Sequence, residues 1–316
     1  PGGIANYVVK RPPNSIESSV RSLTLSYGNG NNSSVALDMG GRYGENNAFG
    51  YRVNAAYEDL NPYVQNAKGH RQLLALAMDW RINANTRLEW EIESSSRQQM
   101  GVNAASITGN SLPSPIYGQS NFSKQSWSVP GVFDGLTGSV RLKHRLDNGW
   151  MWTTQLGAQR LKTDDRLSYA YGCYAENNYD RFCSDKTFDL YDYRSENERR
   201  LNDALQTELT GQVQVAGIQH DLSFTWLRQR QIDKLSPMQA YNWAGTGSLS
   251  GISDSAAASE PFELNTNRQE YATEISIKDR IRVQRFADLW LGLRSSQIQR
   301  DSQRTDGSRA THDERT

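Results

Sequence analysis

The chain has 316 residues, 36% of them hydrophobic, and its 35 basic and 35 acidic side chains cancel to a formal net charge of zero. This balance indicates no polyanionic partner, so nucleic acid is not expected as one. The mean hydropathy of -0.73 is too low for a soluble β-sandwich of this length with a dry core. No run of roughly 18 apolar residues is present, which excludes a transmembrane helix.

The chain opens on Pro1, Gly2 and Gly3, and the glycines allow a tight turn. A short strand pattern follows over residues 4–9, and Pro12 and Pro13 then stop strand pairing. No signal peptide is visible. We therefore interpret the chain as a fragment whose export signal lies upstream.

Beyond this start the sequence predicts about eleven strands: 17–27, 33–43, 48–59, 70–82, 86–97, 136–147, 149–163, 198–215, 217–231, 267–283 and 286–300. Their residues alternate, with Leu205, Leu209 and Val213 on one face and Glu208 and Gln212 on the other. A charge at every second position is costly in a dry core and tolerable in a wet barrel interior. The pattern favours an all-β, antiparallel transmembrane β-barrel.

The connections between these strands are of two kinds. Tight turns lie near 44–47, 83–85, 147–149, 216–217 and 284–286, whereas long loops are expected at 98–135, 164–197 and 232–266. Such loops are unusual inside a compact domain. In a barrel they are extracellular loops, and the tight turns are periplasmic. The polar tail 301–316 is expected to be the start of one more outer loop.

The residues Gly2, Gly3, Asn6, Lys10, Arg11 and Pro12 resemble the end of the plug domain in TonB-dependent outer-membrane siderophore receptors. A second resemblance lies in 279–281 and 289–294, which are similar to a pair of strands in these receptors, although Leu293 separates Gly292 from Arg294. The family has a plugged barrel of about 22 strands. The resemblance implies that residues 1–13 end the plug domain and that 14–316 form the N-terminal half of the barrel.

This resemblance also implies a function, which is energy-coupled uptake of a ferric siderophore across the cell outer membrane. The expected partners are the siderophore, outer-membrane lipid, and TonB with ExbB and ExbD, which would act through N-terminal parts that lie upstream. No cofactor is expected, because the siderophore is a ligand. No metal ligands are expected either, because the iron stays with its chelator.

Three other functions compete with this one. A passive porin or surface-binding barrel is disfavoured by the plug-like motif, because a porin has no plug. An outer-membrane enzyme is disfavoured because the sequence has no Gly-x-Ser-x-Gly, no His-Glu-x-x-His and no P-loop, so no catalytic residue is assigned. A soluble β-rich carbohydrate-binding protein would be recognised by solubility without detergent.

The two cysteines, Cys173 and Cys183, lie ten residues apart in one expected outer loop. A disulfide between them would stabilise this loop by about 2–4 kcal/mol. A metal site is the alternative, but no histidine lies nearby. The same region is rich in aspartates, for which calcium binding and a solvated loop are the two interpretations.

Aromatic side chains in the long loops are the candidate ligand contacts, because rings give large contact area at low conformational cost. The group comprises Tyr117, Phe122, Trp127, Phe133, Tyr169, Tyr171, Tyr174, Tyr241 and Trp243. The leading candidates are Tyr117, Trp127, Tyr171 and Trp243. The competing interpretation is that most of these rings pack the loops together or anchor at the membrane surface.

Overall fold

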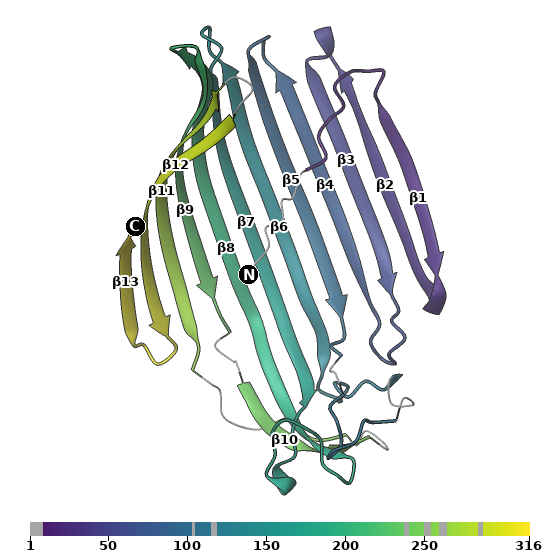
Figure 1. Ribbon diagram of the computed structural model, residues 1–316. Coiled ribbons are helices and arrows are strands. Elements are labelled where there is room, and N and C mark those ends of the chain that lie inside the picture. Colours follow the sequence, from purple (N-terminus) through teal and green to yellow (C-terminus); the bar gives the residue numbers. More distant parts are fainter. Residues whose placement is uncertain are drawn as a thin grey trace.

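The computed structural model describes residues 9–102, 105–114, 119–236, 240–249, 254–258, 264–283 and 287–316. These residues form one antiparallel sheet of thirteen strands (Figure 1). The strands are β1 (Val20–Gly28), β2 (Asn32–Tyr43), β3 (Phe49–Leu60), β4 (Gly69–Arg81), β5 (Thr86–Gln99), β6 (Val129–Arg145), β7 (Met151–Ala170), β8 (Thr187–Val215), β9 (Ile218–Lys234), β10 (Ala240–Ser248), β11 (Thr266–Val283), β12 (Ala287–Arg304) and β13 (Arg309–Arg315). The predicted all-β fold is confirmed.

Each strand pairs with its neighbour in sequence, except that β9 pairs with β11 and β10 pairs with β8. Short turns join the strands at one end of the curved sheet, and the longer connections and β10 gather at the other (Figure 1). We call these the turn end and the loop end. Among the described residues, no helix is long and apolar enough to cross a membrane.

The eleven predicted strands are present, but the predicted loops are too long. Strand β6 begins at Val129, β7 continues to Ala170 and β8 begins at Thr187. The expected loops 98–135 and 164–197 are therefore partly strand. Their polar residues hide the alternation, but the backbones of β7 and β8 remain paired as far as Ala170 and Leu190.

Two further strands contradict the predicted loops. Strand β10 lies within the expected loop 232–266 and pairs with the loop end of β8. The tail is also not an outer loop, because Arg309–Arg315 returns along β12 after a short turn. In that turn Gly307 has φ +88° and Asp306 accepts hydrogen bonds from the backbone N–H and the hydroxyl of Ser308. This turn chemistry closes a hairpin in a sequence too polar to be recognised as a strand.

The two faces of the sheet differ as the alternation predicts. Residues 9–13 lie against one face, which we call the inner face: Arg42 donates to the carbonyl oxygen of Pro13 at 3.0 Å, and Arg11 is paired with Glu91 at 2.5 Å. The other face, the exterior face, carries rows of apolar side chains such as Trp152, Leu209 and Phe224, which are opposite one another. The polar row containing Glu208 lies on the inner face.

Opposite charges pair across the inner wall. Glu89 is buried and lies 3.2 Å from both Arg141 and Lys143. Arg42 and Asp79 form a second, fully enclosed pair at 2.5 Å. Glu89 and Glu91 of β5 therefore have cationic partners on β6 and on the segment before β1, which offset the cost of burying these carboxylates.

Candidate functional site

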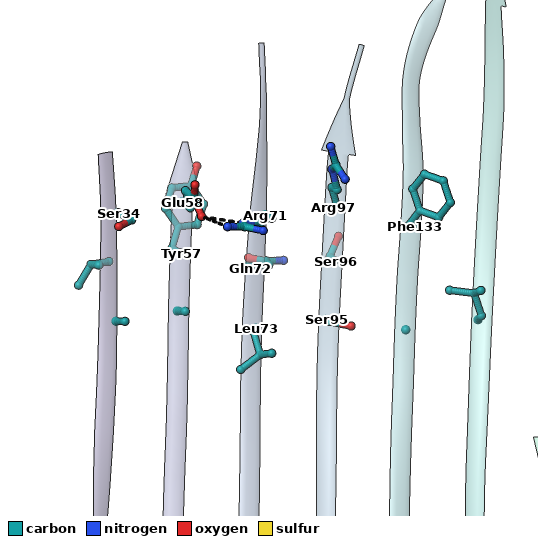
Figure 2. A pocket seen from close by; sticks show the side chains of 15 residues that line it. Ser34, Tyr57, Glu58, Arg71, Gln72, Leu73, Ser95, Ser96, Arg97 and Phe133 are labelled. Atoms are coloured by element: carbon teal, nitrogen blue, oxygen red, sulfur yellow. Dashed lines mark hydrogen bonds and ion pairs between the residues drawn. The ribbon is translucent and has the colours of Figure 1, made fainter. Parts of the chain in front are cut away.

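A hollow of ≈ 460 Å³ lies on the inner face at the loop end of β2–β7 (Figure 2). Its polar wall is formed by Glu58, Arg71 and Arg97, and Arg71 is paired with Glu58 at 2.5 Å. Phe133 and Leu161 add an apolar side. An exposed guanidinium beside an aromatic ring suits an anionic or carbonyl-rich ligand.

A second hollow, of ≈ 540 Å³, lies further along the same strand. Strand β7 connects the two, because Leu161, Asp165, Leu167, Tyr169 and Tyr171 occupy alternate positions on one face of it. The two hollows therefore form one continuous strip on the inner face at the loop end. This strip is the candidate ligand-binding surface.

Four tyrosines line the second hollow, and a fifth, Tyr191, stacks on one of them. We call the five the tyrosine patch: Tyr169, Tyr171, Tyr191, Tyr193 and Tyr241. The rings of Tyr191 and Tyr241 stack at 4.8 Å between centroids. Tyr169 meets Tyr241 edge-on at 5.9 Å. The rings come from three strands, β7, β8 and β10, so the patch exists only because β10 pairs with β8.

A β-bulge places the β8 tyrosines on the inner face. In the ladder, Thr163 is opposite Glu198 and Asp165 is opposite Ser195, so β8 holds one extra residue there. Asn197 takes φ 60° within the bulge, and its N–H donates to Asp164 at 2.6 Å. Without this residue the alternation would turn Tyr191 and Tyr193 to the exterior face.

Burial favours the neutral form of three phenols of the patch. It raises the pKa of Tyr241 to about 12, with a further contribution from Tyr191 and Tyr169. Burial likewise raises the pKa of Tyr191 and of Tyr193. These three rings therefore present uncharged hydroxyls at neutral pH, which donate or accept hydrogen bonds.

A compact loop core supports the patch from behind. Phe122, Phe182, Phe188 and Leu190 pack together and are almost completely buried. Cys173 and Cys183 form a disulfide beside this core. The core fixes β8 and its neighbours beyond the main body of the sheet.

The aspartates of this region have protein partners. Asp192 is fully buried and accepts hydrogen bonds from Arg194, and Asp189 accepts from the N–H of Tyr174 at 2.6 Å. Among the described residues, one group has metal-ligand spacing, namely Cys173, Glu176 and Cys183. Its two sulfurs are bonded to each other. These carboxylates and sulfurs thus hold the loops together.

The leading aromatic candidates occupy different places. Tyr171 belongs to the tyrosine patch. Trp243 is 60% exposed and is opposite Tyr191 in the β8–β10 ladder. Trp127 lines neither hollow. Its indole N–H donates to the carbonyl oxygen of Ser255 at 3.0 Å, and its ring lies under the guanidinium of Arg166. Tyr117 lies outside the described residues.

Other members of the predicted group also differ in position. Phe133 lines the first hollow, and Tyr169 and Tyr241 belong to the patch. Phe122 packs in the loop core, and Tyr174 is 71% exposed at the disulfide loop. Tyr191, Tyr193 and Arg97 were not among the candidates. The alternation of β8 does not place Tyr191 and Tyr193 on the inner face, because the extra residue at the bulge shifts it.

The plug-like motif is described in part. Gly2, Gly3 and Asn6 lie outside the described residues. Lys10 pairs with Asp38 on the inner face at 3.0 Å, Arg11 pairs with Glu91, and Pro12 lies close to Gly50. A side chain at Gly50 would come within 2.7 Å of Pro12, so the two segments need this glycine to approach.

Comparisons with known proteins agree with this architecture. No family model matches the chain. The ferrichrome receptor FcuA of Yersinia enterocolitica is 23% identical over 179 residues, which are 56% of this chain and 23% of that receptor.

Several solved structures are similar over nearly the whole chain. The ferric preacinetobactin receptor BauA of Acinetobacter baumannii has a TM-score of 0.74 and 16% identity, with 95% of this chain and 44% of that one covered. The ferripyoverdine receptor of Pseudomonas aeruginosa has a TM-score of 0.75 and 17% identity, with 96% of this chain and 39% of that one covered. The ferric-catecholate receptor Fiu of E. coli has a TM-score of 0.73 and 16% identity, with 97% of this chain and 47% of that one covered. The chain thus spans less than half the length of these receptors and shares their fold.

Proposed function

We propose, from the barrel fold that this chain shares with outer-membrane siderophore receptors, that it forms part of a TonB-dependent receptor for a ferric siderophore. Residues 14–316 would supply one side of the barrel wall, and residues 1–13 the end of the plug. The ion pairs of Lys10 and Arg11 with the inner wall support this division. Uptake would be driven by TonB with ExbB and ExbD.

The observation that carries this proposal is the position of the tyrosine patch. It lies on the inner face at the loop end, which is the extracellular end of such a barrel, next to the hollow that contains Arg97. Stacked phenols offer apolar area and hydroxyls to a chelate covered with carbonyl and amide groups. The guanidiniums of Arg71 and Arg97 suit the negative charge of a chelate. The iron would remain with its chelator.

Ligand binding is tested in the intact receptor with ferrichrome, ferripyoverdine and a ferric catecholate as probes. For the probe that binds wild type, replacing Tyr191 and Tyr241 together with Ala should weaken affinity by about tenfold or more, or ~1.4 kcal/mol, because a stacked pair of rings is lost. Tyr63→Ala is the matched control, since this ring is 77% exposed. An unchanged affinity in the double variant would overturn the assignment.

Transport separates the receptor from a passive porin. Iron uptake with the bound probe should stop in cells that lack TonB and continue when TonB is restored. Uptake that proceeds without TonB, at a rate proportional to probe concentration, would favour the porin.

A further inference from the structure

Basic side chains gather on the exterior face of the sheet at the loop end of three adjacent strands. This basic rim consists of Arg160 and Lys162 on β7, Arg199 on β8, and Arg228, Arg230 and Lys234 on β9. The ladder places them together: Arg199 is opposite both Lys162 and Lys234, and Arg228 is opposite Leu205 of the apolar row. All six therefore share the face that carries Trp152 and Phe224.

The rim lies where the apolar band of the barrel should end. A strand tilted across a membrane crosses the apolar layer in about 9–11 residues. In β9 the stretch from Ile218 to Trp226 precedes Arg228, and before Arg160 the stretch runs from Trp150, which stacks on Phe224, to Ala158. The basic side chains thus lie at the level of lipid headgroups on the extracellular side.

Few carboxylates neutralise the rim. Arg160 is paired with Asp203 at 2.7 Å, and Lys162 with Asp164 at 2.8 Å. Within the described part of the chain, Arg228 and Arg230 have no carboxylate at ion-pair distance, and both guanidiniums lie over the ring of Tyr271. Two exposed, adjacent guanidiniums held by an aromatic ring are suited to bidentate binding of phosphate.

Two grooves lie in the apolar band, and the first of them begins at the rim. One of ≈ 780 Å³ is lined by Arg228, Arg230, Tyr271 and Asp203 at its polar side and by Ile92, Val140 and Leu156 along its length. Its floor is low because Gly138 and Ala158 face outward between these larger residues. A second groove of ≈ 560 Å³ lies between Trp152, Phe224 and Ile275. Their apolar walls match lipid chains.

We propose that the basic rim is a binding site for a phosphorylated lipid of the outer leaflet. Its phosphates would bind Arg228 and Arg230, with support from Arg160 and Arg199, and an acyl chain would lie in the groove that these two arginines line. The flanking strands lack this chemistry, because exterior positions at the loop end carry Asp134 and Leu136 on β6, and Gln269 and Tyr271 on β11. The site is therefore confined to one sector of the barrel.

The experiment is native mass spectrometry of the intact detergent-solubilised receptor titrated with diphosphoryl lipid A. Wild type should retain this lipid, and Arg228→Gln with Arg230→Gln should lower its affinity by about tenfold or more. Arg268→Gln is the matched control, because Arg268 is exposed at the same end of β11 on the inner face. Unchanged lipid affinity in the double variant would overturn the proposal.

Two further arms separate the lipid from other ligands and from misfolding. Wild type should bind dephosphorylated lipid A and phosphatidylcholine at least about tenfold more weakly, and inorganic phosphate alone should not displace bound lipid. Equal retention of phosphorylated and dephosphorylated lipid would refute phosphate recognition without any variant. Siderophore affinity of the double variant should equal wild type, because the rim lies outside the lumen. If the double variant loses lipid binding but keeps its siderophore affinity, the result does not bear on the proposed transport function.

Discussion

The body of the sheet and the extension beyond it at the loop end are held together by different interactions. In the body, the polar side chains of the inner face pair across strands, as Glu89 does with Arg141 and Lys143. In the extension, β7, β8 and β10 are fixed by a loop core, a disulfide and the bulge at Asn197. The comparison teaches that the wall is built on strand alternation, whereas the ligand surface depends on departures from it.

The largest effect is expected in the body, at the enclosed pair of Arg42 and Asp79. Asp79→Ala should lower the free energy of unfolding by about 3–5 kcal/mol, because it leaves a buried guanidinium without its partner. Urea unfolding of the intact protein in micelles measures this change. Glu58→Ala is the control: it removes a pair whose arginine is 60% exposed, and should cost at most about 1 kcal/mol. Equal costs would mean that the inner wall is solvated throughout.

In the extension, the disulfide should matter locally. Replacing Cys173 and Cys183 with Ser should destabilise the loop core by about 2–4 kcal/mol, because the unfolded loop gains conformational freedom. Hydrogen exchange should therefore accelerate around Phe182 and Phe188, while the amides in the middle of β5 and β6 stay protected. Acceleration in both regions alike would show that the extension and the body unfold as one unit.

The bulge should respond to the residue type at one position. Asn197→Val should cost about 1–2 kcal/mol, because a β-branched residue is strained at φ 60°, whereas Asn197→Gly should be nearly neutral. If the Val variant instead removes the bulge, Tyr191 and Tyr193 turn outward and siderophore affinity falls without loss of barrel. A Val variant with wild-type stability and affinity would contradict the role assigned to the bulge.

The smallest effect is a pH dependence of the patch. The pKa of Tyr241 in the folded protein, about 12, lies above its ordinary value of 10.0, so burial favours the neutral phenol. Its contribution to stability is complete below pH ~10 and is lost as the pH rises toward 12. The phenolate absorbance of wild type should contain a late component that Tyr241→Phe removes. If Tyr241→Phe instead removed a component that titrates near pH 10, the ring of Tyr241 would be exposed.

The strand body was predictable from the sequence because alternation there is regular and uninterrupted. The positions of Trp152, Leu209 and Glu208 follow from a period of two alone. The sequence selected Phe133, Tyr169, Tyr171 and Tyr241 from the candidate ligand-binding surface, whereas it assigned Tyr191 and Tyr193 to a solvated acidic loop. Their inward orientation requires the bulge at Asn197, and no local sequence signal marks an extra residue in a ladder. Trp127 was chosen for its ring type, but its indole N–H donates a hydrogen bond to the carbonyl oxygen of Ser255.

The most direct test of the ligand surface is protection of introduced cysteines in the intact receptor. Tyr191→Cys lies on the inner face in the patch, and Tyr63→Cys lies in an exposed turn at the same end of the sheet. A saturating ferric siderophore that the receptor binds should slow labelling of position 191 by a soluble maleimide by about tenfold, as expected for a ring site covered by ligand, and leave position 63 unchanged. Equal labelling rates at position 191 with and without the ligand would contradict the account.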